Sequence, residues 1–173
     1  MGDARVVEYL NDNFVCTYLK VGTFQIINGQ KVGGNVASYF CLADANASVM
    51  HAIPGQVNPD KMLSEARWAY ETRKTALTFG TVLGTDRVDM RKYYDRVKQA
   101  HLERYNNEAG GMWHMKANTH QQLPQNMPRN LSQQGQAHYL LAKEPLAKLD
   151  RVYRVVWTQV LGEQLSGVPV AKR

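Results

Sequence analysis

The chain has few cysteines and no pair of them at redox spacing. Only Cys16 and Cys41 occur in 173 residues, so no Cys-x-x-Cys motif is present. Disulfide exchange needs a thiol of lowered pKa, which such a motif at a helix start supplies. Both cysteines lie in apolar runs, which favours two free thiols buried inside strands. A disulfide between them, or a reactive thiol at either position, is the alternative.

Other catalytic signatures are also missing. The sequence contains no Gly-x-Ser-x-Gly elbow and no His-Glu-x-x-His helix, and Gly33-Gly34 lacks the Gly-Lys-Ser/Thr ending of a phosphate loop. Glu and Asp pairs occur only among surface charges, which gives a two-carboxylate hydrolase no support. The sequence therefore predicts no catalytic residue and no cofactor.

Long apolar runs are absent as well. No stretch approaches the roughly 18–20 apolar residues of a membrane-spanning helix, and residues 1–5 lack the basic and apolar regions of a signal peptide. We expect a soluble protein without membrane association, cytoplasmic by default, or exported if an upstream signal has been lost. Apolar content of 44% and charged content of 21% are ordinary for a globular protein.

A clear succession of strand and helix signals follows residue 35. Val36–Ala43 and Val49–Ile53 are apolar runs of strand length separated by the polar turn Asp44–Ser48, which predicts a hairpin. Asn58-Pro59-Asp60 then favours a helix start, because Asn58 can cap the helix and Pro59 suits its first position. This helix is expected to continue to about Ala76.

Residues 4–21 indicate a helix followed by a strand. Four apolar side chains share one helical face, Val6, Val7, Leu10 and Phe14. Val15–Val21 then has the composition of a strand. In this order, residues 3–75 resemble the C-terminal half of a thioredoxin-like domain. The resemblance implies a sheet-and-helix unit whose redox motif and first strands would precede Met1.

The chain also departs from that family. The family's cis-proline, expected near Asn35–Ala37, is absent, and so is its Cys-x-x-Cys motif. Either Met1 is internal to a longer natural chain, or the domain is degenerate and has rebuilt its sheet. We favour the first interpretation, because a parallel sheet without its middle strand leaves an apolar face open. Asn28-Gly29 adds a predicted β-ribbon of Phe24–Ile27 and Gln30–Val32, since its type I′ turn needs positive φ.

The second half is predicted to be helical. A linker over residues 77–85 joins the unit over 1–76 to a helical extension over 86–173. Three helices are expected there. The first covers residues 86–108 and is started by Thr85 or Asp86, and the second is capped by Ser132 and runs to about Lys143. The third runs from Leu146 to Leu165 and carries an apolar stripe along one face. His101 lies on the apolar stripe of the first and is interpreted as a hydrogen-bonded, partly buried residue rather than a ligand. The expected fold class is α/β or α+β.

The segment over residues 110–131 gathers histidine and methionine. Its members His114, Met115 and His120 are metal candidates, because imidazole and thioether groups suit copper. No pair has a spacing that fixes coordination geometry, and no carboxylate lies nearby to orient an imidazole. A surface loop explains the same residues, so the sequence commits to no metal.

Charge and the missing thiol pair shape the functional hypotheses. Residues 1–60 carry a net charge of 3 − 5 = −2, which leaves +8 for the remainder of a chain whose net charge is +6. Nucleic-acid binding by the basic half is a hypothesis, but no basic block or recognition motif supports it. The favoured hypothesis is a non-catalytic interaction or scaffold module that binds a protein partner or itself. Its rival is a fragment of a thiol–disulfide oxidoreductase whose Cys-x-x-Cys lies upstream of Met1.

Overall fold

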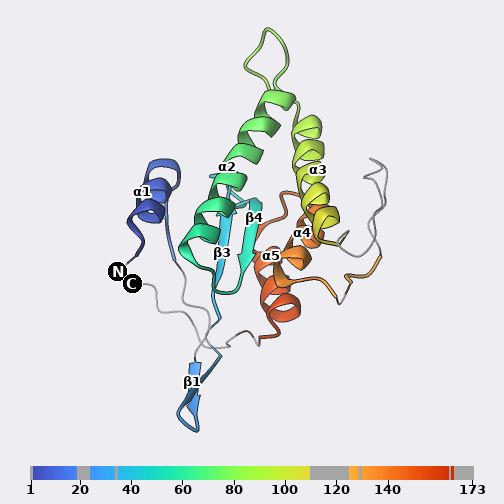
Figure 1. Ribbon diagram of the computed structural model, residues 1–173. Helices are drawn as coiled ribbons and strands as arrows, with labels where there is room; N and C mark the ends of the chain where they lie inside the picture. Colours follow the sequence, from blue (N-terminus) through green and yellow to red (C-terminus); the bar gives the residue numbers. More distant parts are fainter. Residues whose placement is uncertain are drawn as a thin grey trace.

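The computed structural model describes residues 2–18, 24–33, 35–109, 125–128, 130–163 and 165. Helices combine with two separate two-stranded antiparallel sheets, which confirms a mixed α+β class (Figure 1). The elements in chain order are α1 (Ala4–Asn13), β1 (Phe24–Ile27), β2 (Gln30–Gly33), β3 (Ala37–Cys41), β4 (Val49–Pro54), α2 (Pro59–Gly80), α3 (Met90–Ala109), α4 (Gln133–Lys143), α5 (Leu149–Val155) and the π-helical turn η2 (Val156–Val160).

The predicted hairpin is confirmed and forms the centre of the core. β3 pairs with β4 from Ala37 opposite Pro54 to Cys41 opposite Val49, with one irregularity between Phe40 and Cys41. Every residue of β4 is buried, which accounts for its nearly continuous apolar run. The turn between the strands is closed by the Asp44 carboxylate, which accepts hydrogen bonds from two backbone amides.

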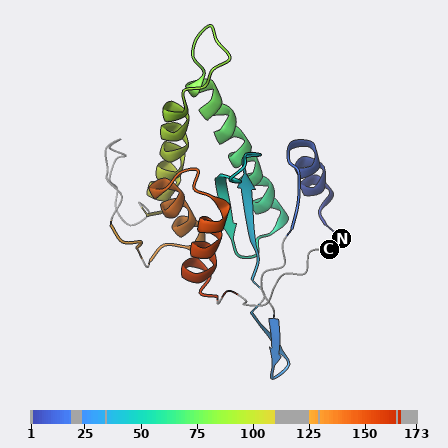
Figure 2. The ribbon, with the colours of Figure 1, turned by 180° about the vertical axis from the view of Figure 1, so that it is seen from behind.

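Helices cover the hairpin from two sides. Figures 1 and 2 place β3 and β4 between α2 on one side and α4 and α5 on the other. Small side chains of α2, Ala66 and Ala69, pack against Phe40 and Ile53. On the other side, the predicted apolar stripe of the last helix is confirmed, with three valines buried against Val49 and α4: Val152, Val156 and Val160.

The segment after α1 differs from the prediction. Residues 15–18 form no strand, Val15 is fully exposed, and Cys16 is exposed rather than buried. Phe14 explains the difference, because it ends α1 and packs edge-on to Phe40 at 5.2 Å between ring centroids. Phe14 is thus the last apolar side chain of this segment that packs into the core, and residues 15–18 lie exposed on the surface. Residues 19–21 of the predicted strand lie outside the described residues.

The start of α2 was predicted correctly, but its end was not. The Asn58 side chain caps the helix by accepting a hydrogen bond from the Lys61 amide. The helix continues to Gly80, so residues 77–80 of the predicted linker are helical. Gly80 approaches the start of α3 closely, and its carbonyl accepts a hydrogen bond from the Asp89 amide. Core residues from both sides of this segment pack together, as Ala76 does with Tyr93.

The later helices start or end at different residues from those predicted. Asp89, not Thr85 or Asp86, accepts hydrogen bonds from the first amides of α3. Ser132 caps α4 as predicted. α5 begins at Leu149 rather than Leu146, because Leu146 has a φ of 56°, which a right-handed helix excludes. At the other end, Gly162 with a φ of 67° follows η2.

The β1–β2 ribbon is also confirmed. Asn28 and Gly29 have φ angles of 51° and 76°, as a type I′ turn requires. The ribbon projects from the end of the molecule opposite the α2–α3 loop (Figures 1 and 2). Among the described residues, no helix is both long and apolar enough to cross a membrane.

Candidate metal centre

Three of the five histidines in the chain meet in the core. His51 comes from β4, His101 from α3 and His138 from α4, and none exposes more than 1% of its surface. Each lies at an inward position of its element, which brings together residues far apart in the sequence. One nitrogen from each ring lies within 4.8 Å of one from each of the others.

Hydrogen bonds fix the orientation of two of these rings. The Nε2 atom of His51 lies 2.8 Å from a carboxylate oxygen of Glu65, and Nε2 of His101 lies 2.9 Å from the backbone carbonyl oxygen of Met50. Both partners accept hydrogen bonds, so each Nε2 carries the hydrogen. The Nδ1 atom of each ring is therefore left with a lone pair.

The third ring completes the cluster. Nδ1 of His138 lies 2.9 Å from Nδ1 of His101, so His138 supplies the hydrogen between them. Its Nε2 faces the side-chain amide nitrogen of Gln134 at 3.4 Å. Nδ1 of His51 has no hydrogen-bond partner although it is buried. A buried acceptor without a partner costs free energy, so this atom calls for an explanation.

A buried carboxylate stands behind His51. Glu65 on α2 exposes no side-chain surface, and its other oxygen lies 2.6 Å from Nζ of Lys61 and 3.4 Å from Nη1 of Arg104. Burial acts to raise the pKa of Glu65, but the hydrogen bonds from His51 and Lys61 and the charge of Arg104 outweigh it and lower the pKa. Glu65 is thus an anion held by two partly exposed cations.

Trp68 closes the cluster on one side. Its ring centroid lies 4.7 Å from that of His51, 5.1 Å from His101 and 5.3 Å from His138, with the rings at steep angles to one another. The guanidinium of Arg104 lies 5.0 Å from the centroid of the indole ring. Together these groups separate the imidazoles from bulk water.

The imidazoles are neutral at physiological pH. Burial lowers the pKa of His101 to about 3 and of His138 to about 2. Burial also lowers the pKa of His51, against the opposing effect of its hydrogen bond to Glu65. Neutral imidazole is the form that binds metal ions, so none of the rings has to release a proton to solvent near neutral pH. Binding through Nδ1 of His138 would require the hydrogen on that atom to move to Nε2.

The arrangement fits a transition-metal ion. Metal–nitrogen bonds of about 2.0–2.1 Å place coordinating nitrogens roughly 3.3–3.6 Å apart, a spacing bracketed by the observed 2.9 Å and 4.8 Å. In metalloproteins a ligating histidine commonly donates its other N–H to a carboxylate or backbone carbonyl, as His51 and His101 do here. An ion between the rings would also give Nδ1 of His51 a partner.

The site was not found by sequence reasoning. His101 was interpreted as a partly buried, hydrogen-bonded histidine, and it is fully buried. His51 and His138 were not singled out. The metal candidates His114, Met115 and His120 lie outside the described residues. Both thiols were expected to be buried, but Cys41 in β3 is only half-buried and Cys16 is exposed.

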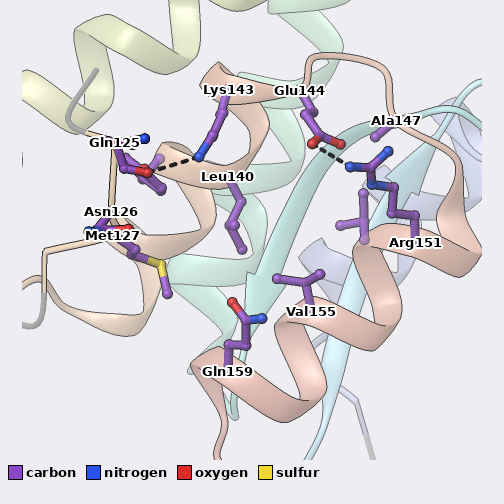
Figure 3. A pocket seen from close by; sticks show the side chains of 12 residues that line it. Gln125, Asn126, Met127, Leu140, Lys143, Glu144, Ala147, Arg151, Val155 and Gln159 are labelled. Atoms are coloured by element: carbon purple, nitrogen blue, oxygen red, sulfur yellow. Dashed lines mark hydrogen bonds and ion pairs between the residues drawn. The ribbon is translucent and has the colours of Figure 1, made fainter. Parts of the chain in front are cut away.

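A groove of about 280 Å³ lies between α4 and α5, beside residues 125–127 (Figure 3). Its cations are already engaged, since Lys143 donates a hydrogen bond to the carbonyl of Gln125 and Arg151 pairs with Glu144 at 2.6 Å. These groups do not converge on a common point, so the groove is a weaker candidate than the histidine cluster.

Comparisons with protein-family models, curated proteins and solved structures found no match for this chain.

Proposed function

We propose that this protein binds one transition-metal ion through His51, His101 and His138, and that the ion stabilises the core of a non-catalytic interaction module. The main support for this proposal is the buried Nδ1 atom of His51. This atom has no hydrogen-bond partner, and its ring is oriented by the contact of Nε2 with Glu65. Three neutral imidazoles from three elements form a ligand set of the kind that zinc, copper, iron and nickel accept.

The origin of the ligands supports a structural role. They come from β4, α3 and α4, while Glu65 comes from α2, so one ion would connect the hairpin with α3 and α4 and, through Glu65, with α2. An ion that binds only the folded state raises the free energy of unfolding, by about 2.7 kcal/mol when its free concentration is 100 times its dissociation constant.

Metal analysis of the purified protein tests this proposal. The chain is stripped with chelator, incubated separately with Zn²⁺ and, without oxygen, with Cu⁺, then desalted and analysed for metal content. We expect one ion per chain with at least one of these metals. Three single variants should lose it: His51→Gln, His101→Gln and His138→Gln. A double variant, His114→Gln with His120→Gln, is the matched control and should keep it.

A direct readout on the unaltered protein guards against variants that fail to fold. Imidazole ¹⁵N spectra should show three rings that change on metal addition, with His51 and His101 coordinating through Nδ1 and retaining the hydrogen on Nε2. The proposal fails if no ion is retained, or if the control variant loses the ion while the three core variants keep it.

The interaction module itself is proposed from the thiols and the surface. Burial raises the pKa of Cys41 to about 11, which disfavours the nucleophilic thiolate. Large apolar side chains, Phe79 and Leu83, are exposed where α2 leads toward α3, and such exposure favours a protein partner or self-association. Light scattering tests self-association, for which a monomer at all concentrations would be contrary evidence.

The thioredoxin-like relationship is likewise a proposal. The β3–β4 hairpin followed by the capped helix α2 supports it, because this is the order of elements at the end of that fold. The sequence upstream of Met1 tests it. A Cys-x-x-Cys encoded there would instead favour the oxidoreductase hypothesis.

A further inference from the structure

We infer that the centre is built for monovalent copper, Cu⁺, held by three imidazole nitrogens without a fourth ligand. This inference rests on the proposed metal site and specifies the ion that it takes. Two independent features carry it: the closed coordination space around the rings and the positive charge beside them.

The first feature is the absence of room for a fourth ligand. His51 and His101 expose none of their surface and His138 exposes 1%, so essentially no water-sized space adjoins the rings. Among the histidine, cysteine, aspartate and glutamate side chains of the described residues, only these three histidines bring ligand atoms together at this point. Zn²⁺ takes four ligands in structural sites, and in catalytic sites it takes three protein ligands with a water molecule. Cu⁺ is stable with three.

Glu65 does not supply the missing ligand. One of its oxygens accepts from His51, and the other lies against Lys61 and Arg104. Moving the carboxylate onto the ion would break these contacts and leave the Nε2 hydrogen of His51 buried without a partner. Such a loss costs roughly 1–3 kcal/mol or more.

The second feature is the local charge. Glu65, Lys61 and Arg104 together carry a net charge of +1, and the three imidazoles are neutral. Of these groups the Glu65 carboxylate lies nearest, 2.8 Å from Nε2 of His51, and the Arg104 guanidinium lies against the Trp68 ring that borders all three imidazoles. The free energy of burying an ion grows with the square of its charge, so an uncompensated dication costs about four times as much as a monocation.

Competition between the two metals tests the inference. Apo-protein is loaded with Zn²⁺, one equivalent of Cu⁺ is added without oxygen, and released Zn²⁺ is measured with a chromophoric chelator. We expect Cu⁺ to displace Zn²⁺, and an excess of Zn²⁺ to leave bound Cu⁺ in place. X-ray absorption of the Cu⁺ form should show three nitrogen neighbours and no fourth ligand.

A charge variant tests the electrostatic part. Lys61→Gln removes a cation beside Glu65, and Lys74→Gln is the matched control, because Lys74 is an exposed lysine of the same helix that pairs with Glu71. The Coulomb energy between Lys61 and the bound ion is proportional to the charge of the ion. Lys61→Gln should therefore lower the dissociation constant of Zn²⁺ by about the square of the factor by which it lowers that of Cu⁺. The control should change neither dissociation constant.

The outcomes separate this inference from the proposed function. If Zn²⁺ stays bound in the presence of Cu⁺, or if the bound Cu⁺ shows four ligands, the inference is overturned while the metal site stands. Equal factors for the two ions in Lys61→Gln would also count against it. If neither metal binds, both the inference and the proposed function are wrong.

Discussion

Acidification of the metal-free protein should weaken the fold through its buried histidines. In the folded state, burial holds the pKa of His101 at about 3 and that of His138 at about 2, against 6.5 for an unperturbed histidine. At pH values between these folded-state pKa values and 6.5, the two histidines are protonated in the unfolded chain and neutral in the folded chain. The free energy of unfolding therefore rises with pH through this window. The part of it contributed by these histidines decreases as the pH falls below 6.5.

The size of the effect follows from these values. Lowering the pH from about 7.5 to about 5.5 protonates each histidine in the unfolded state and not in the folded state, which costs about 1.4 kcal/mol per residue. His101 and His138 together give about 3 kcal/mol, and His51 adds to the loss in the same direction because burial lowers its pKa as well. This is a large share of a total stability of about 5–15 kcal/mol.

Glu65 does not oppose the effect in this range. Its pKa is lowered in the folded state from an ordinary value of 4.5, so it is ionised in both states between about pH 5.5 and 7.5. Its contribution to stability is present above pH 4.5 and is lost only at lower pH. The histidines should therefore dominate the slope that these core groups produce.

Urea unfolding at the two pH values, with chelator present, measures the loss. His138→Gln should reduce the pH-dependent part by about 1.4 kcal/mol, because one of the titrating groups is gone. If the free energy of unfolding of the unaltered protein were the same at both pH values, the three rings could not be neutral in the core as described.

Three further predictions concern Glu65, a helix cap and the thiols. Glu65→Gln should weaken metal binding about 10–100-fold, because His51 loses its anionic partner, whereas Glu71→Gln should leave binding unchanged; equal effects would refute the role of Glu65. Asn58→Ala should cost about 1 kcal/mol in urea unfolding through loss of the α2 cap, and no loss would contradict that cap. In an insulin-reduction assay with dithiothreitol, this chain should show no rate above background; measurable catalysis would refute the non-catalytic module.

Local signals in the sequence predicted much of the fold. The Asn28-Gly29 turn, the Asn58 cap and the Ser132 cap each act within a few residues, and all three are observed. The wrong boundaries depend on tertiary structure. The helix α2 continues through residues 77–80 because its last turn packs against the start of α3, which no local pattern reports.

The histidine cluster was missed for a similar reason. His51, His101 and His138 occur singly, and each in isolation is more often a packed core residue than a ligand. A signal was present, since each lies on the apolar face or run of its own element. Recognising it requires knowing that β4, α3 and α4 meet at one place, which follows only from the packing of the hairpin between the helices.

The spacing of the three ligands along the chain has a consequence for biosynthesis. The ligand at position 138 leaves the ribosome long after those at positions 51 and 101, so a nascent chain cannot form the complete ligand set early. Under the proposed function, capture of an ion by all three imidazoles would therefore have to follow the synthesis of residue 138.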